Sequence, residues 1–127
     1  MSNFAPKRTD YDTGDTRWLR DALRAEQHDI TIDGSLITSD AAGTLVKSGT
    51  HIGRVTATKL GGLYDDASET GGLDTSVGHL RNDLFVKPGE RHLVAVVHGG
   101  TVDRRYLPAG THDANAEADL TAVAYIN

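Results

Sequence analysis

The stretch HLVAVV, residues 92–97, decides the fold class of this 127-residue chain. Five consecutive apolar residues follow His92, three of them valines, whose branched side chains favour strands. Such a strand has apolar groups on both faces, so it belongs at the centre of a sheet or in the wall of a barrel. We therefore expect a mainly β protein, either a small barrel or a small sandwich.

Further strands are predicted on both sides of this stretch. Upstream lie a strand at 83–87, ended by the turn Pro88-Gly89, and another at 76–80. Downstream, Gly99-Gly100 is suited to a two-residue hairpin turn because glycine tolerates positive φ. That turn would lead into a strand at 102–107, and the alternation at 120–126 predicts a last strand that closes the sheet. Residues 108–119 form a polar connector with helix-compatible alanines and a glutamate.

Period-two alternation begins at Ile30 and Ile32, where we expect the first strand. Strands are also predicted at 43–46 and 52–58, the second with a bulge or close backbone approach at Gly53. Residues 60–74 contain GGLYDDASETGGLD, with two glycine pairs and four acids. Because so polar a segment cannot bury itself, we expect a solvated loop there.

The composition limits the function classes open to the chain. Its length fits one domain. With 13 basic and 18 acidic residues the net charge is −5, and no basic cluster exceeds two adjacent residues, so nucleic acid is not an expected partner. The absence of cysteine excludes disulfides and thiolate chemistry. No segment is apolar enough for a membrane helix or a signal peptide, so we expect a soluble protein made in the cytoplasm.

Residues 1–29 differ from the rest of the chain and are interpreted as an N-terminal arm, with a β-rich body at 30–127. The arm is polar and carries a few apolar residues, a pattern typical of segments that fold on a partner surface. The spacing of apolar residues within 15–27 predicts a short amphipathic helix. The alternative, a loose terminus whose helix docks on its own body, stays open. The candidate contact residues of the arm are Phe4, Tyr11, Trp18, Leu19 and Leu23.

No catalytic or metal-binding motif is found, so we expect neither an enzyme nor a cofactor. The six histidines show no HxH or HExxH spacing and are interpreted as surface or turn residues. Asp65-Asp66 and Glu69 lack the ligand order of an EF-hand, and the alternating Asp113–Asp119 stretch is a weak cation signal that also fits an exposed edge. Neither a GxSxG elbow nor a phosphate-binding loop is present.

Three stretches resemble the head decoration proteins of tailed phages, in the version common among actinobacterial phages and related to the lambda-type decoration protein. They are SGTHIGRVTATKLGGLYDDAS (48–68), SVGHLRNDLFV (76–86) and LVAVVHGGTVDRRYLP (93–108). Trp18-Leu19, just before the first strand, also fits the pattern. His79 departs from it, since the family more often has an aromatic residue there.

The resemblance implies a β-tulip or lambda-decoration-like body. It further implies a structural virion protein that binds the outside of the expanded icosahedral capsid as trimers at threefold and quasi-threefold positions. The implied partner is the major capsid protein, crossed by the arm, and the implied role is to stabilise the head against the pressure of packaged DNA. The residues of the trimer interface are not identified.

Two other interpretations remain. The chain could belong to another virion component with a β body, such as a tail, neck or head-fibre base protein, which would form hexameric rings instead of trimers. It could also be a small ligand-binding β module, although such sites need clustered aromatic side chains and this chain has only seven aromatics.

Overall fold

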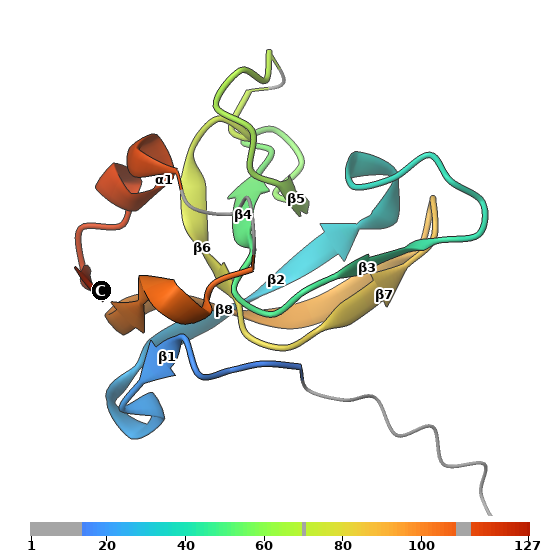
Figure 1. Cartoon of the computed structure of the whole chain (residues 1–127). Coiled ribbons are helices and arrows are strands. Elements are labelled where there is room, and N and C mark those ends of the chain that lie inside the picture. The colour runs from blue at the N-terminus through green and yellow to red at the C-terminus, as the bar shows by residue number, and fades with distance from the viewer. Residues whose placement is uncertain (1–13, 70, 109–112) are drawn as a thin grey trace, which may run out of the picture.

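A computed structural model describes residues 14–69, 71–108 and 113–127 of the chain. This part is mainly β, as expected (Figure 1). Its strands are β1 (Leu19–Arg20), β2 (Glu26–Asp33), β3 (Thr44–Val46), β4 (His51–Arg54), β5 (Gly61–Leu63), β6 (Ser76–Leu80), β7 (Leu84–Val86), β8 (Arg91–Asp103) and β9 (Val123–Ile126). Its α-helix is α1 (Ala114–Asp119), and 3-10 turns occur at Ala22–Arg24, Gly34–Leu36 and Arg104–Tyr106.

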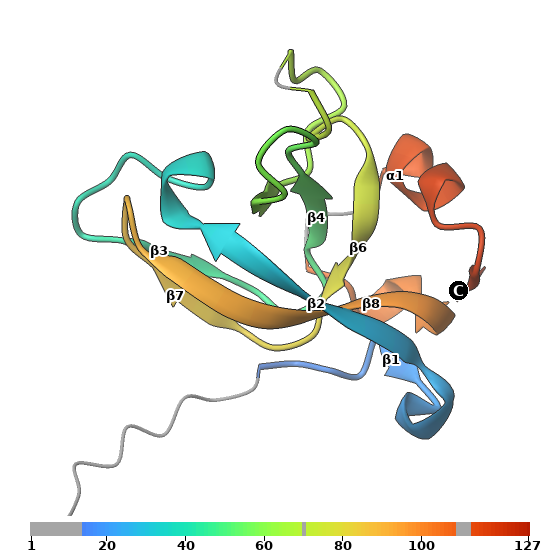
Figure 2. The same cartoon turned by 180° about the vertical axis from the view of Figure 1, so that it is seen from behind.

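Five strands close into a small barrel. β8 pairs with β2, and the order continues through β5 and β4 to β6, which pairs back onto β8. β2 pairs antiparallel with β8 along its whole length, from Glu26 to Asp33, and the two strands form the long diagonal of Figure 2. Because the ring closes, these strands leave few free edges in the barrel wall.

A two-stranded ribbon of β3 and β7 covers one side of this barrel (Figure 1). Val46 and Val86 point from the ribbon into the core, which also contains residues from the barrel strands. The next residues on the outer side, Leu45 and Phe85, are direct cross-strand partners. The buried members of this core are Ile30, Ile32, Val46, Ile52, Leu80, Val86 and Val96.

The last third of β8 leaves the barrel and forms a second small sheet. There β1 pairs antiparallel and β9 pairs parallel with β8, so the C-terminal strand closes the sheet as predicted. Trp18, Leu19, Val97 and Val102 make a second core cluster beneath this sheet. α1 lies beside β6 (Figure 1), and Ala116 of this helix is buried.

The predicted hairpin turn at Gly99-Gly100 is wrong, because β8 continues through both residues. A Cβ atom at Gly99 would approach Glu26 to 3.0 Å, and Gly100 has φ +124° beside Ala25. These glycines therefore allow neighbouring backbone to approach a long strand and do not reverse the chain.

The predicted helix within residues 15–27 is also wrong. Asp21 adopts a left-handed conformation with φ 51°, which ends any helix at that point. Leu19 and Arg20 pair with Val102 and Thr101, and only a 3-10 turn follows at Ala22–Arg24. Burial of Trp18 outweighs the weak local preference for a three-turn helix.

The expected boundary between arm and body after residue 29 does not agree with the pairing of β1 with β8. β2 begins at Glu26, and Trp18 is already part of the core. Other predicted ranges also change: β4 ends at Arg54, and Gly61–Leu63 form strand β5 inside the expected loop. Gly61 lies against the side chains of Ile30 and Ile32, where a larger residue would not fit.

Candidate binding surface

The N-terminal segment that starts at Gly14 is anchored to the body through Trp18. The indole Nε1 of Trp18 donates a 2.9 Å hydrogen bond to the Ser48 Oγ, which itself donates to the Arg81 carbonyl at 2.6 Å. The Ser48 backbone N–H donates to the Asp83 carboxylate at 2.7 Å. Gly14 passes so close to Asp83 that a Cβ atom would clash with this carboxylate. The segment therefore enters the body at a fixed place.

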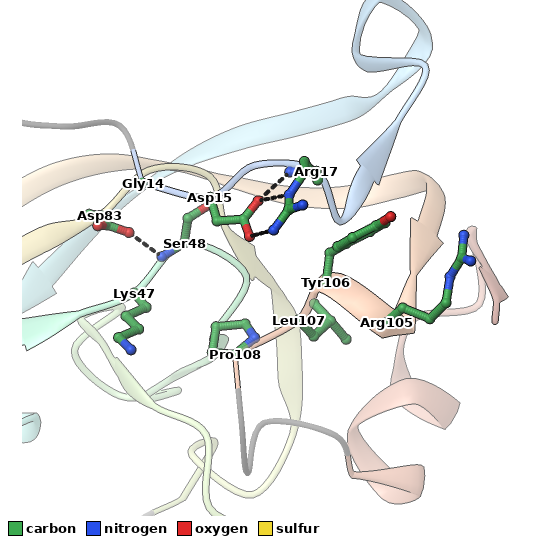
Figure 3. A pocket seen from close by; sticks show the side chains of 10 residues that line it. All are labelled: Gly14, Asp15, Arg17, Lys47, Ser48, Asp83, Arg105, Tyr106, Leu107 and Pro108. Carbon is green, nitrogen blue, oxygen red and sulfur yellow. Dashed lines mark hydrogen bonds and ion pairs between the residues drawn. The ribbon is translucent and has the colours of Figure 1, made fainter.

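Beside this anchor is a cleft of about 420 Å³ (Figure 3). Arg17 holds Asp15 through two side-chain hydrogen bonds of 2.9 and 2.7 Å, and these bonds lower the pKa of Asp15 to about 2. The Arg17 guanidinium carbon lies 4.5 Å from the centre of the Tyr106 ring, a cation–π distance. The lining residues are Gly14, Asp15, Arg17, Lys47, Ser48, Asp83, Arg105, Tyr106, Leu107 and Pro108.

A second hollow of about 300 Å³ adjoins the cleft and shares its lining residues Lys47 and Pro108. It is also lined by Leu45 on β3 and Leu63 on β5. Leu45 is 52% exposed and its cross-strand partner Phe85 is 44% exposed. We call Leu45 and Phe85 the ribbon pair. The second hollow places Leu45 beside the cleft, whose lining includes both basic side chains (Arg17, Lys47 and Arg105) and acidic ones (Asp15 and Asp83). We call the ribbon pair and the cleft together the candidate surface.

Of the predicted contact residues of the arm, the structure describes Trp18, Leu19 and Leu23, and it places Leu23 apart from the other two. Phe4 and Tyr11 lie outside the described residues. Trp18 and Leu19 are buried in the second core cluster, so their side chains are not free for a partner surface in this conformation. Leu23 is 99% exposed in the 3-10 turn and remains a candidate contact.

Sequence reasoning missed the ribbon pair. The signal was present, because Val46 and Val86 point into the core and their neighbours Leu45 and Phe85 must then point outward. It was overlooked because each strand has only three residues, which is too short for a clear alternation. Leu93 on β8 is a further exposed apolar side chain, at 70%.

The interpretation of the histidines as surface or turn residues is wrong for His51 and His79. Both are buried, and their ring centroids lie 4.1 Å apart with the ring planes tilted by 40°. The Nδ1 of His79 donates to the Gly49 carbonyl at 2.7 Å, and its Nε2 accepts from the Tyr125 hydroxyl at 2.7 Å. Burial lowers the pKa of His79 to about 4. The imidazole is therefore a neutral member of the core at pH 7.

The acidic stretch Asp113–Asp119 has structural roles. Asp113 caps α1 by accepting hydrogen bonds from the N–H groups of Asn115 and Ala116. The Glu117 carboxylate binds the Arg104 guanidinium at 2.8 Å, and Asp119 accepts from the Ser76 N–H at 3.0 Å. Within 14–69, 71–108 and 113–127, no group of three or more histidine or acidic side chains could hold a metal ion.

No protein-family model matches this chain, and no curated protein matches it either. A functional assignment therefore depends on the sequence resemblance, the fold and this surface. No helix in the described ranges is long and apolar enough to cross a lipid bilayer.

Proposed function

We propose that this chain is a structural virion protein that binds the outside of an expanded icosahedral capsid. It acts there as trimers at threefold and quasi-threefold positions and stabilises the head against the pressure of packaged DNA. Its partner is the major capsid protein. The proposal rests on the sequence resemblance of residues 48–108 to head decoration proteins, and the exposed ribbon pair is the structural observation that supports it most.

The ribbon pair supports binding to a protein surface because of its position. Leu45 and Phe85 expose apolar area on the outer side of a rigid ribbon whose inner side is held in the core by Val46 and Val86. Contact residues held by a rigid scaffold lose little conformational freedom on binding. The adjoining cleft adds Tyr106, an aromatic residue of the kind that often contributes most to interface energy.

The residues before Gly14 would extend this contact. Gly14 itself lines the same cleft. The thirteen preceding residues carry Phe4 and Tyr11 and could span about 40 Å if extended, enough to reach beyond one subunit. Two weak contacts joined in one molecule bind together far more tightly than either alone, and a trimer multiplies this effect.

Co-sedimentation with capsids tests the proposal. The full-length chain is mixed with expanded, undecorated capsids of its own phage and, in parallel, with unexpanded procapsids. We expect saturable binding to expanded capsids only, with a stoichiometry of three copies per threefold position. Absence of binding to either particle would refute the proposal, and hexameric rings of the free protein would favour a tail or neck component.

Single substitutions then test the ribbon pair. Leu45→Ser and Phe85→Ser should each weaken capsid binding about tenfold or more, because each removes apolar contact area at a rigid site. Leu93→Ser is the matched control, since Leu93 is also exposed but lies on β8 and lines neither the cleft nor the second hollow. Equal affinities for all three variants and the unmodified chain would remove the ribbon pair from the interface.

A further inference from the structure

Two histidines from distant parts of the sequence meet on neighbouring strands. His28 lies on β2 and His98 on β8, 70 positions apart, and their Nδ1 atoms are 2.8 Å from each other. The ring centres are 4.8 Å apart. Neither residue belongs to the surface described above. No sequence spacing predicts this meeting, because it depends on the register of β2 against β8.

The contact brings the two Nδ1 atoms within hydrogen-bond distance of each other. A neutral imidazole has one N–H and one free lone pair, so one Nδ1 must donate a proton to the other. Two nitrogens that converge on a shared proton can also converge on a metal ion. With metal–nitrogen bonds of about 2.0–2.1 Å, nitrogens at this separation subtend about 90° at the metal. That angle suits the square-planar or tetragonal geometry of Cu(II) and Ni(II).

A carboxylate lies near the outer nitrogen of one ring. The Glu26 carboxylate is 3.7 Å from the Nε2 of His98. A carboxylate near the outer nitrogen of a metal-binding histidine favours a proton on Nε2, which leaves Nδ1 free for the metal.

There is also room for further ligands. A cavity of about 470 Å³ opens beside the two rings and is lined by Ser76 and Asp119 among others. Water molecules in this cavity can fill the remaining coordination positions. Arg54 lines the same cavity and opposes a cation there, whereas Glu26 and Asp119 favour one.

We propose that His28 and His98 form a two-nitrogen binding site for a divalent transition-metal ion of the Cu(II) or Ni(II) class, completed by water. On binding, the proton that the two Nδ1 atoms share moves to the Nε2 of the donor ring. The neutral pair therefore binds the ion without net proton release. The bound ion would link β2 to β8 at the point where their register shifts, between Glu26 and Gln27.

Titration of the full-length chain with NiCl₂ tests the site. Calorimetry should give one ion per chain, and Ni(II) should raise the thermal unfolding midpoint. His28→Asn and His98→Asn should each weaken binding about tenfold or more, because a single imidazole holds these ions poorly. His92→Asn is the matched control, since His92 is also a half-buried histidine on β8. Unchanged binding in His28→Asn would overturn the proposal.

A second measurement needs no variant and so does not depend on how the variants fold. Substoichiometric Cu(II) should broaden the imidazole NMR signals of His28 and His98 before those of any other histidine in the unmodified chain. Broadening that begins at another histidine, or no broadening at all, would refute the site. Capsid binding plays no part in either experiment, so their outcome is separate from the proposed function.

Discussion

His79 occupies a place in the core where only a neutral imidazole fits. Its Nδ1–H donates to Gly49 and its Nε2 accepts from Tyr125, so a second proton would break the Tyr125 bond and bury a charge. Its pKa falls from 6.5 in the unfolded chain to about 4 in the folded one. A histidine with a lowered pKa stabilises the fold above pH 6.5, and this stability is lost as the pH falls toward 4.

We therefore expect the free energy of unfolding to decrease by roughly 3 kcal/mol between pH 6.5 and pH 4 on account of His79. Urea unfolding at several pH values across this range measures the change. His79→Gln is the control, because glutamine offers a donor and an acceptor but does not titrate. If the variant loses as much stability over the same range as the unmodified chain, His79 is not the group responsible.

A substitution at Ser48 tests whether the Trp18–Ser48 hydrogen bond anchors the N-terminal segment. Ser48→Ala removes the acceptor of the Trp18 indole N–H, which is left buried without a partner. The expected cost is about 1–3 kcal/mol of unfolding free energy, measured by urea titration followed through Trp18 fluorescence. Thr50→Ala is the control, because the Thr50 hydroxyl also bonds a backbone carbonyl but at an exposed position. Equal small losses in both variants would contradict the anchor.

At the scale of elements, the close approach of β6 to β8 depends on Gly78. A Cβ atom there would lie 2.4 Å from the Val96 side chain and 2.5 Å from the Val97 carbonyl. Its φ of +152° also disfavours a side chain. Gly78→Ala should cost about 1–3 kcal/mol of unfolding free energy, because the two strands must move apart. Gly71→Ala, where no atom lies within 4 Å, is the control and should change the stability little.

The elements also show what could be predicted from the sequence. The strands at 76–80 and 84–86 follow from local apolar patterns, and both lie where they were expected. The hairpin turn predicted at Gly99-Gly100 is wrong because a glycine pair permits either a turn or the close approach of another strand. Only the neighbouring strands decide which of the two forms. The helix predicted within 15–27 does not form, and here too a distant contact decides the local structure, because Trp18 bonds to Ser48, 30 residues away.

The candidate surface was less predictable than the fold. Leu23 was predicted as a contact residue and is exposed. Trp18 and Leu19 were also predicted as contact residues, but their side chains are buried in the body. Apolar residues near a terminus fit either an external contact or the protein's own core, and composition alone does not separate the two. The His28–His98 pair required the register of two strands that begin 65 residues apart, which local patterns do not contain.

At the scale of the whole molecule, residues ahead of the expected boundary at residue 30 pack with the folded body, since β1 and the start of β2 pair with β8. Removal of residues 2–33 should therefore unfold the protein, because it deletes Trp18 and β2, the strand that pairs with most of β8 and helps close the barrel. Removal of residues 2–13 should leave the fold intact, since Trp18 and its bond to Ser48 remain.

Circular dichroism and urea unfolding distinguish the two deletions. The shorter deletion should unfold cooperatively, within about 1 kcal/mol of the full chain, because both core clusters and the Trp18–Ser48 bond remain. The longer one should show no cooperative transition. Cooperative unfolding after removal of residues 2–33 would mean that the barrel closes without β2, and the assignment of residues 14–33 to the body would then be wrong. If the shorter deletion is folded but no longer binds expanded capsids, the lost affinity can be attributed to residues 2–13 alone.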